Sequence, residues 1–301
     1  MEPDDMIPDA FARQWKLILV PGMLAYLFLV QVLRYQRAKS LERKYAPAGR
    51  ESFRKMTAED AQAILKTLAE LEFPSLYEFS MIMALFRTYG IPSISSLLVA
   101  TGQLKNAETA SKRAADAGVL LFEFGLNKPT SERAVEAIAR MNFLHCPYRK
   151  SGKITNDDLL YTLGVFALEP SRWINRYEWR RLSDVEMCAC GTYWKSVGDA
   201  MEISYAKLPS SAEGWQDGLQ WLEEVEEWSG EYEEAHMVPA DNNRQLAESQ
   251  LDYLLPKWPA RYRGLCRKMI VVLLGDRLRR SMIYPKSPAI YHNIVNSMLD
   301  A

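Results

Sequence analysis

Residues 131–170 read SERAVEAIARMNFLHCPYRKSGKITNDDLLYTLGVFALEP, and this stretch decides how the chain is expected to fold. Four of its residues recur at steps of three, four and three: Val135, Ile138, Asn142 and His145. Such steps keep side chains on one face of a helix, the face that a core would cover. The imidazole of His145 is therefore predicted to point inward.

Two prolines are expected to delimit the helices of this stretch. Pro147 has no amide hydrogen for a helical bond, so the first helix is predicted to end near His145. The sequence TNDD from Thr155 is a capping box, which predicts a second helix running to Leu168. Pro170 then begins a stretch rich in tryptophan and arginine.

Helical spacing recurs along the rest of the chain, and no segment keeps the alternation typical of a strand. Thr57 and Ser183 open further capping boxes, and a turn is predicted at Gly90. The other expected helices cover residues 57–72, 76–89, 108–124, 183–203, 215–232, 245–255, 263–274 and 290–299. The pattern predicts an all-α fold, an irregular globin-like helical bundle.

An apolar run near the N-terminus, LILVPGMLAYLFLVQVL at residues 17–33, is predicted to be a single transmembrane helix. At 1.5 Å per residue it spans roughly 25 Å, which suffices with polar flanking residues that reach the interface. A signal peptide is the rival interpretation, but residues 31–33 are not a small-residue cleavage site and the run is long. A buried core helix containing Pro21 and Gly22 is the other alternative.

The charges beside this run predict its orientation. Five basic residues follow it, Arg34, Arg37, Lys39, Arg43 and Lys44, whereas only Arg13 and Lys16 precede it. The positive-inside rule then places the rest of the chain in the cytosol. We expect a short lumenal tail (1–14), a transmembrane anchor (15–34), a basic linker (35–56) and a cytosolic helical domain (57–301).

Composition excludes several classes of function. The chain has 37 basic and 38 acidic residues, so its net charge gives no reason to expect nucleic acid as a partner. Its four cysteines lack CxxC spacing and it has three histidines, which argues against a zinc site or a disulfide framework. Neither a nucleotide-binding glycine motif nor GxSxG occurs. Asp157 and Asp158 are explained as capping residues of the second helix.

A buried imidazole on an apolar helix face has two interpretations. It is a satisfied core residue, or it is the axial ligand of a haem, which needs a neutral imidazole. Arg140, Arg149 and Lys150 lie near His145 in sequence and are candidates to pair with haem propionates. The residues alone favour a core histidine.

Longer blocks of the chain resemble a known family. They are ALFRTYGIPSIS (84–95), TASKRAADAGVL (109–120), the segment 140–184 and GTYWKSVGDAMEIS (191–204). They are similar to the fungal ER-bound oxygenase family, known for cleaving the farnesyl chain of a mycophenolic acid precursor. That family shares its catalytic domain with the latex-clearing rubber oxygenases, which are haem b enzymes. The apolar run and WLEEVEEWS (221–229) also resemble the fungal branch, whose members usually continue beyond position 301.

The resemblance implies roles for particular residues. The family's HxxxR pattern falls on His145 and Arg149, which implies that His145 is the axial ligand of haem iron. A second motif, on the oxygen-binding side, falls on Arg113, Asp116 and Ala117, and implies catalytic roles for Arg113 and Asp116. The chain departs from its relatives there, because Ala117 stands where threonine is usual and Asp116 where the rubber oxygenases have lysine. Arg140 is a further candidate for binding haem.

The function implied is that of a haem b oxygenase in the endoplasmic reticulum membrane, with its catalytic domain in the cytosol. With molecular oxygen as co-substrate, it would cleave a carbon–carbon double bond in a lipophilic, prenylated secondary metabolite. One alternative is a haem hydroxylase, epoxidase or cyclisation catalyst of the same pathway class. The other is an anchored protein without enzymatic activity that holds a lipophilic intermediate.

Overall fold

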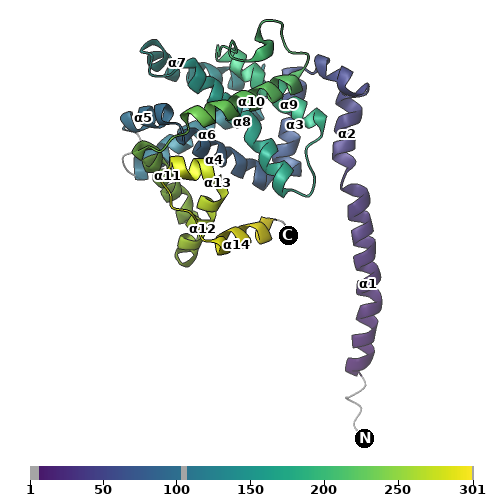
Figure 1. Cartoon of the computed structure of the whole chain (residues 1–301). Coiled ribbons are helices and arrows are strands. Elements are labelled where there is room, and N and C mark those ends of the chain that lie inside the picture. The colour runs from purple at the N-terminus through teal and green to yellow at the C-terminus, as the bar shows by residue number, and fades with distance from the viewer. Residues whose placement is uncertain (1–6, 103–106, 300–301) are drawn as a thin grey trace.

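The computed structural model describes residues 7–102 and 107–299, and these residues form helices without any strand (Figure 1). This confirms the all-α prediction. The first helix, α1 (Ile7–Leu33), projects away from a bundle in which most of the later helices pack together (Figure 1). The chain thus has one isolated apolar helix and one packed helical body.

Helix α1 exposes its apolar side chains. Phe28 is 72% exposed and Leu24 is 62% exposed. The segment Ile18–Tyr45 contains a window long and apolar enough to cross a membrane, and none of that window is buried. A core helix would bury such residues, so the core-helix alternative is wrong. The exposure fits a membrane anchor.

The basic segment after α1, expected as a linker, is helical and packed against the bundle. It forms α2 (Gln36–Tyr45) and a 3-10 helix, η2 (Gly49–Lys55). Phe53 is buried in the core. Arg37 pairs with Glu72 at 3.2 Å, and the Arg34 guanidinium stacks on Trp179 with its carbon 4.4 Å from the ring centre. These contacts tie the base of the anchor to the bundle.

Five helices form the centre of the bundle: α3 (Ala58–Thr67), α4 (Pro74–Tyr89), α8 (Asn156–Tyr177), α9 (Asp184–Ala200) and α10 (Gly218–His236). The three predicted helix starts are confirmed. Thr57 and Thr155 accept a hydrogen bond from the amide three residues on, at 3.1 and 3.0 Å, and Ser183 forms a capping box with Glu186. Helix α8 is the most buried, with Leu160, Ala167 and Ile174 completely enclosed.

Two glycines let α9 and α10 approach closely. The backbone of Gly191 in α9 lies directly against the carbonyl group of Gly218 at the start of α10, so a Cβ on Gly191 would overlap that carbonyl. The amide and hydroxyl of Thr192 occupy the corresponding space beside Gly218. Glycine at both positions therefore permits contact between the backbones of these two helices.

The two prolines do not end their helices. Helix α8 continues through Pro170 to Tyr177, and α7 (Glu132–Lys150) continues through Pro147. A proline inside a helix costs about 3 kcal/mol. From Asp158 to Ser171 every residue of the helix except Thr162 is buried, so packing outweighs that cost. Pro147 lies in the last turn, where few helical bonds remain to be lost.

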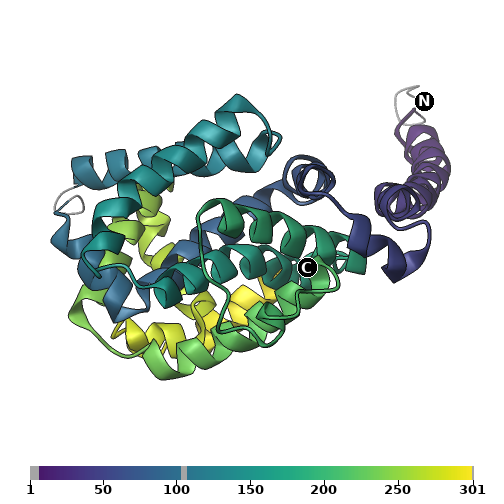
Figure 2. The ribbon, with the colours of Figure 1, turned by 90° about the horizontal axis from the view of Figure 1, so that it is seen from above.

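The remaining helices surround this centre. Helices α4 and α5 (Pro92–Ala100) meet at the predicted turn with a bend of 93°. Helix α6 (Ala107–Leu126) and α7 form an antiparallel hairpin along one edge of the bundle (Figure 2). Helix α9 ends at Ala200, earlier than predicted. The other elements are η3 (Leu68–Glu72), η4 (Pro209–Ser211), α11 (Asp241–Leu254), η5 (Leu255–Lys257), α12 (Ala260–Leu273), α13 (Gly275–Ser281) and α14 (Ala289–Leu299).

Candidate functional site

The α6–α7 hairpin carries all the candidate site residues. Ser131 caps α7 by accepting a hydrogen bond from the Ala134 amide at 3.4 Å. Across the turn, Arg133 donates to Glu123 at 2.7 Å. Charge-assisted bonds of this length are among the stronger hydrogen bonds in proteins, and this one fixes α7 against the end of α6. It also lowers the pKa of Glu123.

An open cavity of about 320 Å³ lies between the two helices of the hairpin. Its lining includes Leu120 from α6 and both Ala137 and Arg140 from α7. One helical turn further along each helix lie residues 113–117 on α6 and 141–145 on α7. The antiparallel arrangement therefore brings these two candidate segments to the same level of the hairpin. Sequence spacing alone does not give this juxtaposition.

His145 is half-buried on α7, and its Nδ1 atom is shielded from solvent. The buried stripe of α7 includes Ala134 and Ala137, whereas Val135 is 54% exposed. The prediction that Val135 begins the core-facing stripe is therefore wrong. The residues that pack inward are offset by about one position, and His145 lies at the margin of this stripe.

The neighbours of His145 on α7 bind the end of α9. Asn142, one turn before it, donates to the Ala200 carbonyl oxygen at 2.9 Å. Arg149, one turn after it, donates to the carbonyl oxygens of Met201 and Glu202 at 2.9 and 3.1 Å. Met201 and Glu202 directly follow the last residue of α9, where the helix dipole leaves partial negative charge, so an arginine is well suited to bind their carbonyl oxygens. His145 thus lies between two attachment points of α7.

The other candidate residues differ in how accessible their side chains are. Arg140 is exposed, and its guanidinium carbon lies 5.3 Å from the ring centre of Phe143. Asp116 is exposed on α6 and Ala117 is half-buried beside it. Arg113 lies on α6, but its side chain is outside the described residues. Arg140 and Asp116 are therefore accessible, whereas the guanidinium of Arg149 is already bonded.

Neither of the other two histidines is placed to serve as a ligand at this hairpin. His236, on α10, stacks on Tyr232 with ring centres 4.2 Å apart, and its Nδ1 lies 3.1 Å from the Tyr232 carbonyl oxygen. His292 is exposed on α14. Among the described residues no group of three or more His, Cys, Asp or Glu side chains could hold a bare metal ion.

The cysteines and the paired aspartates have structural surroundings. Cys188 and Cys190 are buried in α9, and burial raises the pKa of Cys190 to about 12. A thiol that stays protonated is a poor nucleophile and metal ligand. The Asp158 carboxylate accepts hydrogen bonds from Ser93 at 2.6 Å and from Tyr232 at 2.9 Å, besides its contact with Thr155. This supports the interpretation of Asp158 as a structural residue.

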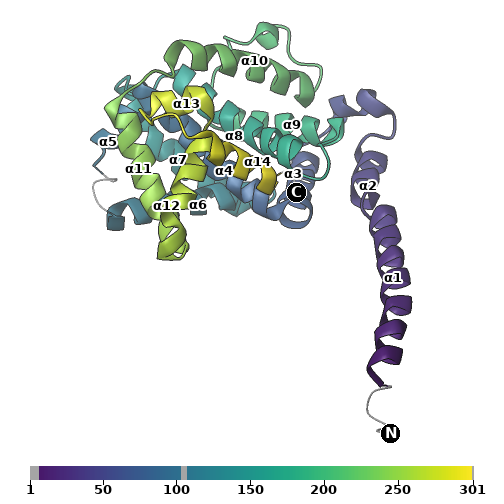
Figure 3. The same cartoon turned by 60° about the horizontal axis from the view of Figure 1, so that its bottom comes forward.

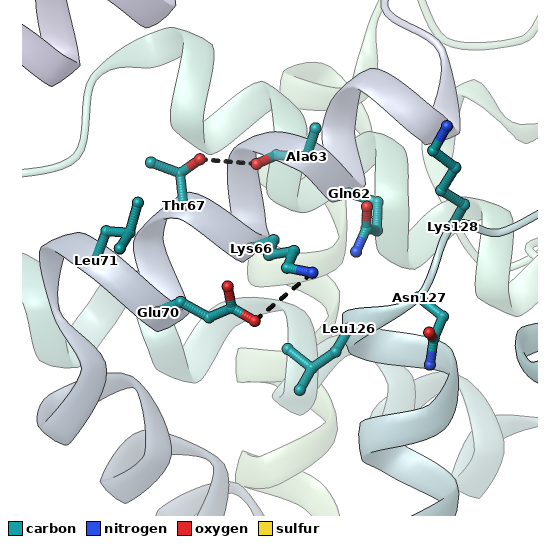
Figure 4. Close-up of a pocket in the computed structure, with 9 residues that line it drawn as sticks. All are labelled: Gln62, Ala63, Lys66, Thr67, Glu70, Leu71, Leu126, Asn127 and Lys128. Atoms are coloured by element: carbon teal, nitrogen blue, oxygen red, sulfur yellow. Dashed lines mark hydrogen bonds and ion pairs between the residues drawn. The ribbon is translucent and has the colours of Figure 1, made fainter.

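A second open cavity, of about 470 Å³, lies between α3 and the end of α6 (Figure 4). Lys66 and Glu70, one helical turn apart on one wall, form an ion pair of 3.7 Å, and Leu126 at the end of α6 also lines the cavity (Figure 4). None of the candidate residues lines it. Its lining carries only ordinary helix-surface side chains, so the hairpin remains the better candidate site.

Sequence reasoning missed a buried ionic cluster that joins three helices. Arg87 of α4 binds Glu169 of α8 at 2.9 Å and Glu233 of α10 at 2.7 Å. Tyr161 and Trp173 donate to these same carboxylates, at 3.0 and 2.8 Å. Burial lowers the pKa of Arg87, but the two carboxylates raise it overall. The sequence feature that could have indicated this cluster is Glu169, a single acidic residue in the otherwise apolar run before Pro170.

With this geometry in hand, comparison with known proteins identifies the family. Residues 79–293 match the family described as "ER-bound oxygenase mpaB/B'/Rubber oxygenase, catalytic domain". The chain belongs to this oxygenase family. The match includes both helices of the hairpin and confirms the resemblance found in the sequence. The membership makes the chain an oxygenase.

Relatives in this oxygenase family come from two Penicillium species. The chain is 45% identical to ER-bound oxygenase mpaB' of Penicillium brevicompactum over 286 residues, which cover 95% of the chain and 68% of the relative. It is 47% identical to ER-bound oxygenase mpaB of Penicillium roqueforti (strain FM164), over 90% of the chain and 91% of the relative. It is 49% identical to ER-bound oxygenase mpaB of Penicillium brevicompactum, over 80% of the chain and 62% of the relative.

Proposed function

We propose that this oxygenase binds haem b through His145 and cleaves a carbon–carbon double bond in a lipophilic, prenylated metabolite. The observation that carries the proposal is the place of His145, half-buried on α7 with Nδ1 shielded from solvent. An imidazole inside a protein can bind iron through one ring nitrogen, as a haem ligand does.

The donor set fits haem better than a bare ion. A zinc or non-haem iron site needs three or four protein ligands, and the described residues offer no such group. Iron in a macrocycle needs a single axial ligand from the protein. His145 meets that requirement, and the exposed guanidinium of Arg140 would hold a propionate.

Arg149 receives a different role from the one expected. Its guanidinium is bonded to Met201 and Glu202, so we assign it to positioning α7 rather than to a propionate. In the family's HxxxR pattern, His145 would then be the ligand. Arg149 would be the residue that fixes α7, the helix of that ligand, against α9.

The proposed reaction would use the iron of haem and side chains of the protein for different steps. Haem, when bound, supplies the iron that activates molecular oxygen. Arg113 and Asp116 are on α6, the helix that packs against α7, so we propose that Arg113 polarises the oxygen and Asp116 accepts a substrate proton and later returns it. Both oxygen atoms end in the two carbonyl groups formed when the double bond breaks. The reaction therefore needs no additional reductant.

The anchor supports the proposed substrate class and the proposed location. The relatives are named ER-bound, and we propose the same membrane for this chain, with the five basic residues after α1 on the cytosolic side. A substrate with an isoprenoid tail partitions into the bilayer. Tethering the domain there raises the local concentration of that substrate.

Absorption spectroscopy of the full chain in detergent, supplemented with haem, tests the proposal. We expect a Soret band that His145→Ala shifts or abolishes, and that added imidazole restores in His145→Gly. His292→Ala, at an exposed position on α14, is the matched control and should keep the wild-type spectrum. A wild-type spectrum in His145→Ala, or a chain that stays colourless, would contradict haem ligation by His145.

Product mass tests the reaction separately from haem binding. Cleavage shortens a prenylated substrate and leaves a carbonyl group on each fragment. Hydroxylation or epoxidation instead adds one oxygen atom to an intact chain. A haem-loaded protein that gives only the second product would overturn double-bond cleavage while leaving the role of His145 intact.

A further inference from the structure

The turn before α12 and the first residues of that helix are exposed without interruption. Residues 256–265 read PKWPARYRGL, and every one of them is exposed. Three large apolar side chains are among them: Trp258 is 55% exposed, Tyr262 43% and Leu265 40%. Monomeric proteins rarely expose such a group of aromatic and aliphatic side chains within one short segment unless something binds there.

The same segment is locally basic, although the whole chain is nearly neutral. Between Asp252 and Asp276 there is no acidic residue, while five cations occur: Lys257, Arg261, Arg263, Arg267 and Lys268. The chain overall has 37 basic and 38 acidic residues. The local excess therefore favours an anionic partner.

Three of these five cations have structural contacts and two remain at the surface. Lys268 donates to the Tyr291 hydroxyl at 2.9 Å. Arg263 donates to the Trp258 carbonyl oxygen at 3.0 Å and so fixes the turn, and Arg267 pairs with Glu248. Arg261 lies over the Tyr262 ring at 4.6 Å, and Lys257 lies 5.1 Å from the Tyr253 ring centre. Both are exposed. Cations beside exposed aromatic rings are typical of residues at a membrane interface.

The position of the segment relative to the anchor identifies the partner. Figure 1 shows α12 at the side of the bundle toward which α1 extends, and the different view in Figure 3 agrees. Helix α14 packs against α12 and exposes Ile290 to 62%. A bilayer crossed by α1 would lie on this side of the domain. The exposed segment before and within the start of α12 would then be near the headgroup region.

We propose that residues 256–268 form a second membrane contact, in which Trp258, Tyr262 and Leu265 enter the interface and Lys257 and Arg261 bind anionic lipid headgroups. The contact would fix the orientation of the domain, which a single helix leaves free to rotate. It rests on α1 being the anchor and is independent of haem binding. The partner is the lipid surface itself rather than another protein.

Fluorescence quenching in nanodiscs tests the contact with the full chain. The discs contain phosphatidylcholine and phosphatidylserine brominated near the headgroup end of the acyl chains, which quench nearby tryptophans. The chain has eight tryptophans. We expect Trp258→Phe to remove a quenched component of up to about one eighth of the emission, because an interfacial tryptophan lies at the depth of the bromines.

Controls separate this contact from insertion of the anchor. Trp228→Phe, on α10 and stacked on Tyr232, should leave the quenched component unchanged. Residual quenching from Trp15, beside the apolar run, reports that α1 has inserted. The double variant Lys257→Gln, Arg261→Gln should reduce the Trp258 component in these discs.

Two outcomes would overturn the proposal. Equal quenching of the wild type and Trp258→Phe, with α1 inserted, would show that the segment does not reach the bilayer. An unchanged Trp258 component in the double variant would remove the role of anionic headgroups. Neither result would affect the Soret band, so failure here is distinguishable from failure of haem binding.

Discussion

The guanidinium of Arg149 donates a 2.9 Å hydrogen bond to the carbonyl oxygen of Met201, which joins α7 to the end of α9 one turn after His145. A second bond reaches the Glu202 carbonyl oxygen, at a residue with a positive φ of 56°. The family pattern suggests a cofactor contact for this arginine, whereas the geometry places its donors on the protein. In the proposed haem site, any effect of Arg149 on the cofactor would pass through the position of His145.

Replacing Arg149 by alanine should therefore destabilise the chain even without haem. We expect a loss of about 1.5–3 kcal/mol, the usual range for hydrogen bonds made by a charged group. Urea denaturation of the haem-free protein in detergent, followed by tryptophan fluorescence, measures this. Arg140→Ala is the control, since Arg140 is exposed and should change the stability little. If Arg149→Ala and the wild type are equally stable, the positioning role is wrong, and Arg149 is again a candidate to bind the haem propionates.

Truncating Glu233 should be among the most damaging single changes in the bundle. Its carboxylate accepts from Arg87 at 2.7 and 2.9 Å and from Tyr161 at 3.0 Å, inside the core. Glu233→Ala removes one of the two carboxylates that neutralise Arg87 and should cost about 3–5 kcal/mol. Glu234→Ala, at an exposed position on the same helix, should have a free energy of unfolding within about 0.5 kcal/mol of the wild-type value. Urea midpoints of the two variants compare them directly.

Local signals predicted the elements whose determinants lie within a few residues. The capping boxes at Thr57 and Ser183 and the turn at Gly90 are contained in four-residue patterns, and the structure has each of them. The apolar run of α1 is equally local. Propensity and capping act over one helical turn, so a single sequence is enough to recognise them.

Features that depend on distant partners were not predictable from spacing. Helix α8 passes through Pro170 because residues from several other helices bury it, and no local pattern contains that information. Arg87 and its partner Glu233 are 146 residues apart. At the candidate site, spacing and resemblance pointed to His145. The attachment of Arg149 to Met201 became visible only with the packing of α7 against α9.

The contact between α9 and α10 offers a paired test of backbone packing. Gly191→Ala places a Cβ against the Gly218 carbonyl group and should destabilise the chain by about 1–3 kcal/mol, the cost of overpacking. Gly230→Ala, inside α10 with open space around it, should instead stabilise it by roughly 0.5–1 kcal/mol. Thermal unfolding followed by circular dichroism should show a lower melting temperature for Gly191→Ala and a higher one for Gly230→Ala. A neutral result for Gly191→Ala would mean that the two helices separate easily.

The carboxylate of Glu224 is expected to contribute to the stability of the fold above acid pH. Burial raises the pKa of Glu224, but hydrogen bonds from Ser210, Trp215 and Gln220 outweigh burial and lower that pKa below its ordinary value of 4.5. The Ser210 amide and Trp215 Nε1 lie 3.0 and 2.9 Å from Oε2, and the Gln220 amide lies 3.1 Å from Oε1. A lowered pKa in the folded state stabilises the fold above the unfolded pKa.

This contribution should disappear as the pH falls from 4.5 through the lower pKa of the folded state, because both states then bind the proton. Glu224→Gln should cost about 1 kcal/mol at pH 7, a modest value since the carboxylate is partly solvated. The difference in the free energy of unfolding between the variant and the wild type should shrink as the pH falls below 4.5. Urea denaturation of both proteins between pH 3 and 7 measures it, with the exposed Glu227→Gln as control. A difference that stays constant with pH would assign the effect to side-chain shape rather than to ionisation.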